Sequence, residues 1–151
     1  MNEISNLCSA VANAINEAKI IPNKAEFRAN FKIDVEKFRG DSLIYVCPHS
    51  QCCEIDSRST LMRTIAVDVV LQYKLRSESQ EEAVEDLGSD ADALENFLFN
   101  LDIGPYRFLK TEYYPYHGES LKESRVFVSI ITVTYRGMAR FVKNRKAFNA
   151  S

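Results

Sequence analysis

The side chains best suited to chemistry lie close together in one short segment of the chain. Three thiols and an imidazole fall within seven residues (Cys47, His49, Cys52 and Cys53). Thiolate and imidazole are good zinc ligands, and four of them can close a tetrahedral site. The spacing argues against a site here, because Cys52 and Cys53 are adjacent and no Cys-x-x-Cys pair is present. We expect a strand-end cysteine followed by a thiol-containing loop, and no metal; the alternative is a metal-dependent enzyme built on these four residues.

Other forms of catalysis find little support in the sequence. The only histidines are His49 and His117, each in a predicted loop, and no nucleophile-elbow pattern accompanies them. The five glycines are scattered, and none forms GxGxxG or GxxxxGK[ST]. We therefore expect no enzymatic activity and no cofactor.

Charge is distributed unevenly along the chain, although the net charge is only −2. Nine acidic residues and no basic one lie between Ser77 and Tyr106 (Glu78, Glu81, Glu82, Glu85, Asp86, Asp90, Asp92, Glu95 and Asp102). Five basic residues and no acidic one lie from position 136 to the end (Arg136, Arg140, Lys143, Arg145 and Lys146). Such a dense acidic run is usually a solvated helix face. The opposed charges also suit head-to-tail association of identical copies.

An aromatic group with two interpretations follows the acidic run (Tyr106, Phe108, Tyr113, Tyr114 and Tyr116). Interleaved with Arg107 and Lys110, these rings could stack nucleic-acid bases. More often such residues are core and edge positions of a strand, or interface anchors. The basic C-terminal residues likewise either contact phosphates or dock on an acidic neighbour.

Length and composition favour a single folded domain. The chain has 151 residues, of which 46% are hydrophobic and 26% charged. This is long enough to bury a core without disulfides or metal. No apolar stretch is long enough for a membrane helix and no secretory signal is visible, so we expect the cytoplasm of the producing cell and reduced thiols. We place the domain at residues 1–137 and a basic tail at residues 138–151.

The first third of the chain predicts a helix and a strand. Apolar residues recur every three or four positions from Ile4 to Ala18, and Pro22 ends that pattern. Residues 24–36 alternate between apolar and polar, which favours a strand over about residues 26–33. A helical alternative exists, because Phe27, Phe31, Val35 and Phe38 lie at helical spacing and Asn23 with Glu26 resembles a capping box.

The middle of the chain predicts a long hairpin. A short strand from Ser42 to Cys47 ends at Pro48, and a polar loop from Pro48 to Ser59 leads into a strand from Thr60 to Leu75. This loop is longer than most hairpin loops, which makes it a candidate contact arm.

The last half predicts a helix and two strands. An apolar stripe marks the helix (Val84, Leu87, Ala91, Leu94, Leu98 and Leu101). A capping box of Ser79 and Glu82 begins it, Gly88 weakens it, and Gly104-Pro105 ends the element. Strands follow at 107–114 and 125–136, the latter apolar on both faces like a central strand. The order α-β-β-β-α-β-β predicts an α+β fold: an antiparallel, at most mixed, sheet of about five strands with two helices on one face.

Two stretches resemble small phage proteins of the head–tail neck and tail end. The first is FKIDVEKFRGDSLIYVCPHSQCCEIDSRSTLMRTIAVDVVLQYKL, where a strand ending in proline precedes a loop closing at Arg58 and a long DVVLQYKL strand. The second is VFVSIITVTYR, which is similar to the closing strand of those proteins. The family most resembled is the tail-terminator, or tail-completion, proteins of long-tailed phages, typified by protein U of phage lambda. The cysteine-rich loop and the basic tail depart from that layout.

The resemblance implies a structural virion protein and no catalytic residues. Such subunits form a ring, usually a hexamer, that caps the tail tube and joins the head connector while DNA passes through without specific binding. We expect location in the virion tail, or in the host cytoplasm during assembly, and no membrane partner. The acidic helix would line the lumen or meet the basic tail of a neighbour (Glu78, Glu81, Glu82, Glu85 and Asp86 with Arg140, Lys143, Arg145 and Lys146). Loops would contact the tube or connector (Ser50, Gln51, Glu54, Arg58, His117 and Glu119). The alternative function is a cytoplasmic module that binds nucleic acid or a small ligand through its sheet and tyrosines.

Overall fold

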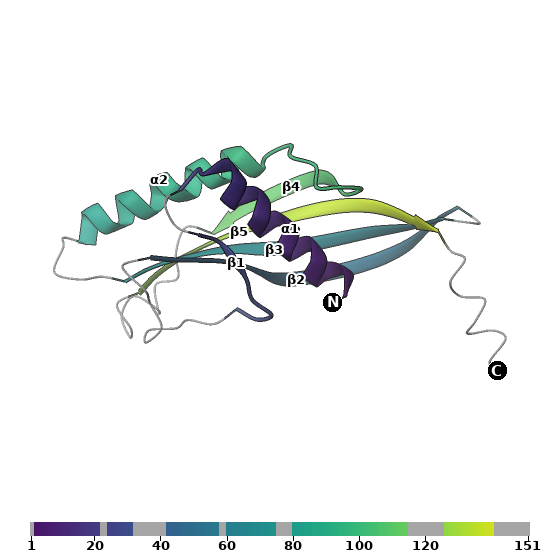
Figure 1. The fold of residues 1–151 in the computed structure, drawn as a ribbon, viewed down its shortest axis with the longest axis horizontal. Helices are drawn as coiled ribbons and strands as arrows, with labels where there is room; N and C mark the ends of the chain where they lie inside the picture. Colours follow the sequence, from purple (N-terminus) through teal and green to yellow (C-terminus); the bar gives the residue numbers. More distant parts are fainter. Residues whose placement is uncertain are drawn as a thin grey trace.

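The computed structural model describes residues 2–21, 24–31, 42–57, 60–74, 80–114 and 126–140. Its elements are α1 (Glu3–Ala18), β1 (Glu26–Phe27), β2 (Ser42–Ser57), β3 (Thr60–Lys74), α2 (Gln80–Leu98), β4 (Arg107–Tyr114) and β5 (Val126–Arg140). The five strands form one sheet in the order β1-β2-β3-β5-β4. Figure 1 shows β2, β3 and β5 running along the longest axis of the molecule. The predicted order of elements and the α+β class are confirmed.

Helix α1 begins and ends with recognisable caps. The Asn2 side chain accepts a hydrogen bond from the Ser5 amide at 2.9 Å, and Lys19 adopts a left-handed conformation with φ 52°. The Asn16 side chain then fixes the chain that follows the helix. Its Nδ2 donates to the Ala25 carbonyl at 2.8 Å, and its Oδ1 accepts from the Ala25 amide at 2.7 Å. This pair of bonds holds the start of β1 against α1.

Strand β1 is much shorter than the predicted strand over 26–33. It contains two residues and pairs in parallel with Tyr45 and Val46 of β2. The Arg28 amide still donates to the Val46 carbonyl at 3.0 Å, and the bend at Ala29 and Asn30 then turns the chain away from β2. Asparagine is disfavoured in strands, which agrees with the bend. Residues 32–41 lie outside the described part. Because β1 is parallel and every other pairing is antiparallel, the sheet is mixed.

The prediction of a loop from Pro48 to Ser59 is wrong. Strand β2 continues to Ser57 and pairs with β3 along its whole length, with register shifts at Pro48/Ser50 and Ile55/Ser57. Proline is tolerated because this part of β2 is an edge strand and the irregularity is a bulge, so no ladder hydrogen bond requires the missing N–H. The segment predicted to be a loop is therefore part of strand β2, and the hairpin extends the sheet.

The second half of the chain follows the prediction closely. Leu87, Ala91, Leu94 and Leu98 of α2 are buried, and β4 has the predicted bounds. The helix ends at Leu98, before the predicted Gly104-Pro105, because Asn100 takes a left-handed conformation with φ 61° and turns the chain. Strand β5 runs to Arg140, four residues beyond the predicted end. Residues 138–140 of the expected tail thus belong to the sheet.

The two faces of the sheet carry different kinds of side chain. On the helix face, one apolar cluster joins both helices to inward residues of the three long strands, among them Ile44, Val67, Val69 and Ile131. This confirms that the helices share a face. The opposite face, called the second face below, holds a smaller apolar cluster (Tyr45, Cys47, Val70 and Val128, with Leu43 and Ile130 against it). None of the described helices is long and apolar enough to cross a membrane.

The far ends of β2, β3 and β5 form what we call the arm: residues 50–57, 60–64 and 136–140. Residues 50–57 of β2 are all exposed. Arg63 of β3 forms an ion pair with Glu3 at the start of α1, which fixes the base of the arm to the helix layer. Ile55 is 71% exposed and Met138 is 58% exposed. The arm therefore projects from the core as part of the same sheet.

Candidate functional site

The four residues of the alternative metal site (Cys47, His49, Cys52 and Cys53) do not come together. Cys47 is fully buried on the second face, whereas Cys52 and Cys53 are exposed and, being adjacent in a strand, point to opposite faces. Cys47 pairs with Asp68 and Cys53 with Arg63, which lie five residues apart on β3. At about 3.3 Å per residue, Cys47 and Cys53 are therefore roughly 16 Å apart along the sheet. Within the described residues no group of three or more potential ligands could hold a metal ion.

The most chemically organised group is a histidine held by a carboxylate. His49 Nδ1 lies 3.0 Å from Asp68 Oδ2, and Thr132 Oγ1 donates to Asp68 Oδ1 at 2.6 Å. A carboxylate that orients an imidazole is one half of a nucleophilic site. In the described residues no hydroxyl or thiol is hydrogen-bonded to the His49 ring. Burial and the charge of Asp68 raise the pKa of the neighbouring Cys47 to about 12, so this thiol stays protonated and is a poor nucleophile.

A second polar network lies beside it on β4. Lys110 Nζ lies 2.9 Å from Glu112 Oε1, and Tyr114 Oη donates to Glu112 Oε2 at 3.0 Å. The hydrogen bond from Lys110, followed by that from Tyr114, lowers the pKa of Glu112, and the same contacts raise the pKa of both donors. These groups are exposed and satisfy one another, so they form a surface network without catalytic geometry.

Helix α2 presents the predicted acidic face. Glu85, Asp86 and Asp92 are exposed, and burial raises the pKa of Asp90. Glu81 and Glu82 lie in the first turns of the helix, and Glu78 lies outside the described residues. Arg140 is the last residue of β5, while Lys143, Arg145 and Lys146 lie outside the described part.

The residues predicted for contact loops lie in two settings. Ser50, Gln51 and Glu54 are exposed on β2 of the arm, in a strand and not in the predicted loop, because β2 continues past the bulge. Arg58, His117 and Glu119 lie outside the described residues.

The tyrosines do not form one stacking platform. Tyr106 and Tyr113 pack against the helix-face cluster, whereas Tyr114 is half exposed and bonds Glu112 on the second face. Tyr116 lies outside the described part of the chain. Base stacking by several of these rings at once therefore finds no common surface, which leaves the interpretation as core and edge residues.

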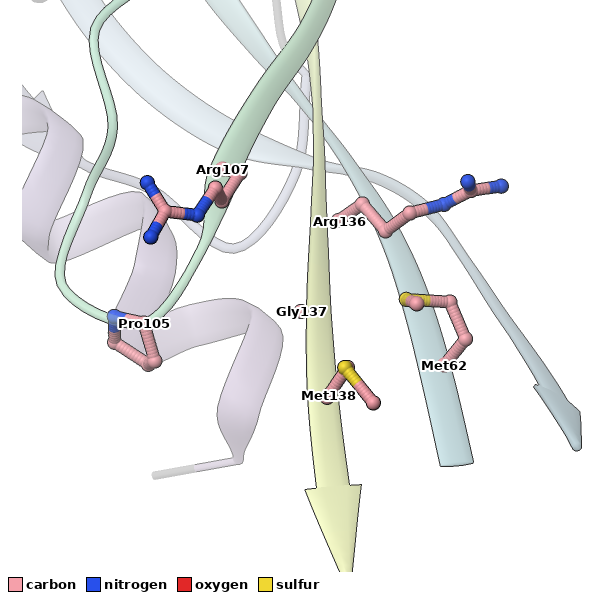
Figure 2. Close-up of a pocket in the computed structure, with 6 residues that line it drawn as sticks. All are labelled: Met62, Pro105, Arg107, Arg136, Gly137 and Met138. Atoms are coloured by element: carbon pink, nitrogen blue, oxygen red, sulfur yellow. The ribbon is translucent and has the colours of Figure 1, made fainter. Parts of the chain in front are cut away.

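The arm and β4 enclose a hollow of about 360 Å³ lined by Met62, Pro105, Arg107, Arg136, Gly137 and Met138. Figure 2 shows the Arg107 and Arg136 guanidinium groups pointing away from each other, with the methionines on the arm side. The turn before β4 forms one wall. Asp102 accepts from the Phe108 amide at 2.8 Å and from Arg107 at 3.0 Å, and the Tyr106 ring lies over Gly137. The hollow is a feature of an exposed edge, with no converging polar groups.

Both sides of the sheet end in exposed edges. On one side, within the part of the chain that the structure describes, β1 pairs with only Tyr45 and Val46 of β2. On the other side lies β4, where five of eight residues are exposed (Arg107, Leu109, Lys110, Glu112 and Tyr114). Strand order depends on long-range pairing, so these edges could not be assigned from the sequence. The nearest signal was the aromatic group around β4, for which edge positions or interface anchors were among the expected roles.

Comparisons with known proteins show no family for this chain. No protein-family model matches the chain, and no curated protein matches its sequence. Among solved structures, a chain from the "Virion of native gene transfer agent (GTA) particle" matches with a TM-score of 0.46 and 10% sequence identity, covering 93% of this chain and 99% of that one. A TM-score below 0.5 does not establish a shared fold.

Proposed function

We propose that this chain is a structural subunit of a phage-like virion, without enzymatic activity, that forms a ring at the end of the tail tube. The observation that supports this most is the arm. It extends the sheet away from the core and exposes large apolar side chains at Ile55 and Met138. Ile55 pairs with Leu61 on the helix face and Met138 with Met62 on the second face, so each face of the arm offers an apolar side chain for contact with another subunit. The resemblance of the sequence to tail-terminator proteins agrees with this role.

Chemistry on the described surface is consistent with a passive role. The His49–Asp68 pair lacks a nucleophile, and the pKa of Cys47 is raised by burial. A ring subunit needs two different complementary surfaces. The acidic outer face of α2 serves as one candidate, either lining the lumen, where it would repel passing DNA, or meeting the basic residues of a neighbour. The arm serves as another, and its residues Ser50, Gln51 and Glu54 are candidates for contact with other subunits.

The role in the particle is tested in a host that produces the virion. Deletion of the gene should yield tails of uncontrolled length or heads that stay unjoined, and complementation should restore joined particles. Tagged protein should be found at the junction of head and tail by immunogold labelling. Wild-type particles from the deletion strain, or absence of the protein from purified particles, would contradict the proposal.

The lumen hypothesis has its own test. Glu85 and Asp86 are exposed, so their replacement by serine should leave the fold intact. If α2 meets a neighbour's basic residues, this double variant should lose the salt dependence of assembly, and removal of residues 141–151 should do the same. The cut falls after Arg140 because β5 extends that far. Unchanged salt dependence in both variants would leave only the lumen version.

A further inference from the structure

The exposed segments at the two edges of the sheet are equal in length and run in opposite directions. Strand β4 has eight residues, and the exposed stretch 50–57 of β2 is equally long. The strands β2, β3, β5 and β4 pair antiparallel in succession, so β2 and β4 run in opposite directions. Figure 1 shows them on opposite sides of the sheet. When copies follow one another around a ring, β2 of one copy therefore meets β4 of the next copy as an antiparallel neighbour.

Full overlap of the two segments places complementary side chains opposite each other. With residue 57 opposite residue 107, Glu54 meets Lys110 and Ile55 meets Leu109. Ile55 is 71% exposed and Leu109 is 46% exposed, and neither is explained by packing within its own chain. Among the described residues, Glu54 has no ion-pair partner. Lys110 contacts Glu112 at 2.9 Å on the surface, and such a pair is worth little, so Lys110 can also serve a partner.

Outside the irregularities at Ile55/Ser57 and Phe108/Lys110, the same register keeps the side chains of both strands on matching faces. Within one chain, Cys52 pairs with Thr64 and Glu54 with Met62 on the second face, while Cys53 pairs with Arg63 on the helix face. On β4, Glu112 pairs with Thr132 on the second face and Thr111 with Val133 on the helix face. Full overlap sets Cys52 opposite Glu112 and Cys53 opposite Thr111. Because a shift by one residue would invert this match, agreement at these regularly paired positions supports a single register.

We propose that β2 residues 50–57 of one copy pair with β4 residues 107–114 of a second copy, joining the sheets into one continuous sheet. The partner is thus another molecule of this chain, bound through backbone hydrogen bonds between edge strands. The contact is heterologous, since each copy contributes β2 on one side and β4 on the other, and it closes when the ring is complete. This inference rests on the proposed ring and specifies the surface that forms it.

Disulfide cross-linking tests the register in the full-length protein. Cys53 with Thr111→Cys, in a Cys52→Ser background, places two thiols opposite each other between copies. The Cα atoms of opposed residues in an antiparallel pair lie about 4.5–5.5 Å apart, within the range of about 4.4–6.8 Å that a disulfide bridges. Mild oxidation should give a ladder of covalent oligomers on a non-reducing gel. The ladder should end at one largest species, because a heterologous contact extends until the ring closes.

A matched control uses the other face. Cys52 with Glu112→Cys, in a Cys53→Ser background, should give the same ladder. The crossed combination, Cys53 with Glu112→Cys in the Cys52→Ser background, should run as a monomer on the non-reducing gel. Its two thiols lie on opposite faces and cannot be bridged. Equal cross-linking in all three variants, or in none, would overturn the inference. A product that stops at the dimer would show a self-complementary contact and would overturn it as well.

Charge reversal tests the pair of Glu54 and Lys110. Glu54→Lys should reduce ladder formation severalfold, and Glu54→Lys combined with Lys110→Glu should restore it. A ladder that is unchanged by both the single and the double substitution would contradict the pairing of Glu54 with Lys110. Cross-linking is measured on the isolated protein, whereas the virion role is measured in particles. A correct ladder with no protein in particles would therefore overturn the virion role alone, and a protein found in particles without a ladder would overturn the edge pairing alone.

Discussion

The helix-covered part of the sheet and the arm are built from the same three strands, but they differ in what surrounds them. Under the helices, strand residues such as Val67, Leu71 and Ile131 are completely buried. On the arm, residues 50–57 of β2 are all exposed. Burial of an aliphatic side chain stabilises a fold by about 1.5–3 kcal/mol, so the stability of the chain comes mostly from the first region. The arm contributes little to folding, which leaves its sequence available for contacts between subunits.

The largest expected difference between the two regions concerns apolar truncation. Leu94 of α2 is completely buried and Ile55 of the arm is 71% exposed. Leu94→Ala should lower the free energy of unfolding by about 2–5 kcal/mol, because it removes packed groups and leaves a cavity. Ile55→Ala should change it by less than about 0.5 kcal/mol. Urea unfolding followed by circular dichroism measures both, and a comparable loss in the two variants would show that the arm belongs to the core.

A smaller effect is expected where the arm meets the turn before β4. A Cβ atom added at Gly137 would lie 2.7 Å from Cδ1 and 2.8 Å from Cε1 of Tyr106. Gly137→Ala should therefore destabilise by about 1–3 kcal/mol through displacement of the ring. In a Tyr106→Ala background the same change should cost much less. A double-mutant cycle by urea unfolding gives the coupling, and additive effects would mean that the ring does not define this junction.

Alkaline pH should destabilise the covered region through its buried thiols. Burial is the main cause that raises the pKa of Cys8 and of Cys47 from 9.0 to about 12. Between about pH 9 and pH 12 the unfolded chain releases these protons while the folded chain keeps them, so the free energy of unfolding should fall as the pH rises. Chemical unfolding across this range measures the slope. Cys8→Ala or Cys47→Ala should reduce this slope, with the stability of each variant compared to its own stability at neutral pH. The double change Cys52→Ser with Cys53→Ser should leave the slope unchanged.

The mildest probe separates the regions by thiol access. Cys52 and Cys53 are exposed, and Cys8 and Cys47 are buried. Ellman's reagent should titrate two thiols per native chain at neutral pH and four after unfolding in urea. Rapid labelling of all four in the native protein would show that the second face opens readily near Cys47.

The same contrast explains what could be predicted from sequence. The apolar stripe of α2 and the bounds of β4 follow from periodicity, because side chains that pack on a core must recur on one face. The edge part of β2 lacks that signal, since neither of its faces is buried and Pro48 reads as a strand end. Its strand is imposed by hairpin pairing with the adjacent strand β3, and its own residues carry no apolar alternation that would indicate a strand. The free edges, and hence the match of Glu54 with Lys110, appear only once the strand order is known.

Pairing between copies can be measured most directly by hydrogen–deuterium exchange at low and high protein concentration. Edge strands exchange quickly when their amides face solvent, and they become protected when a neighbouring strand binds. Assembly should therefore slow exchange in residues 50–57 and 107–114 together, with little change in α1. Protection confined to α2, or assembly with no protection in either edge strand, would contradict the continuous sheet.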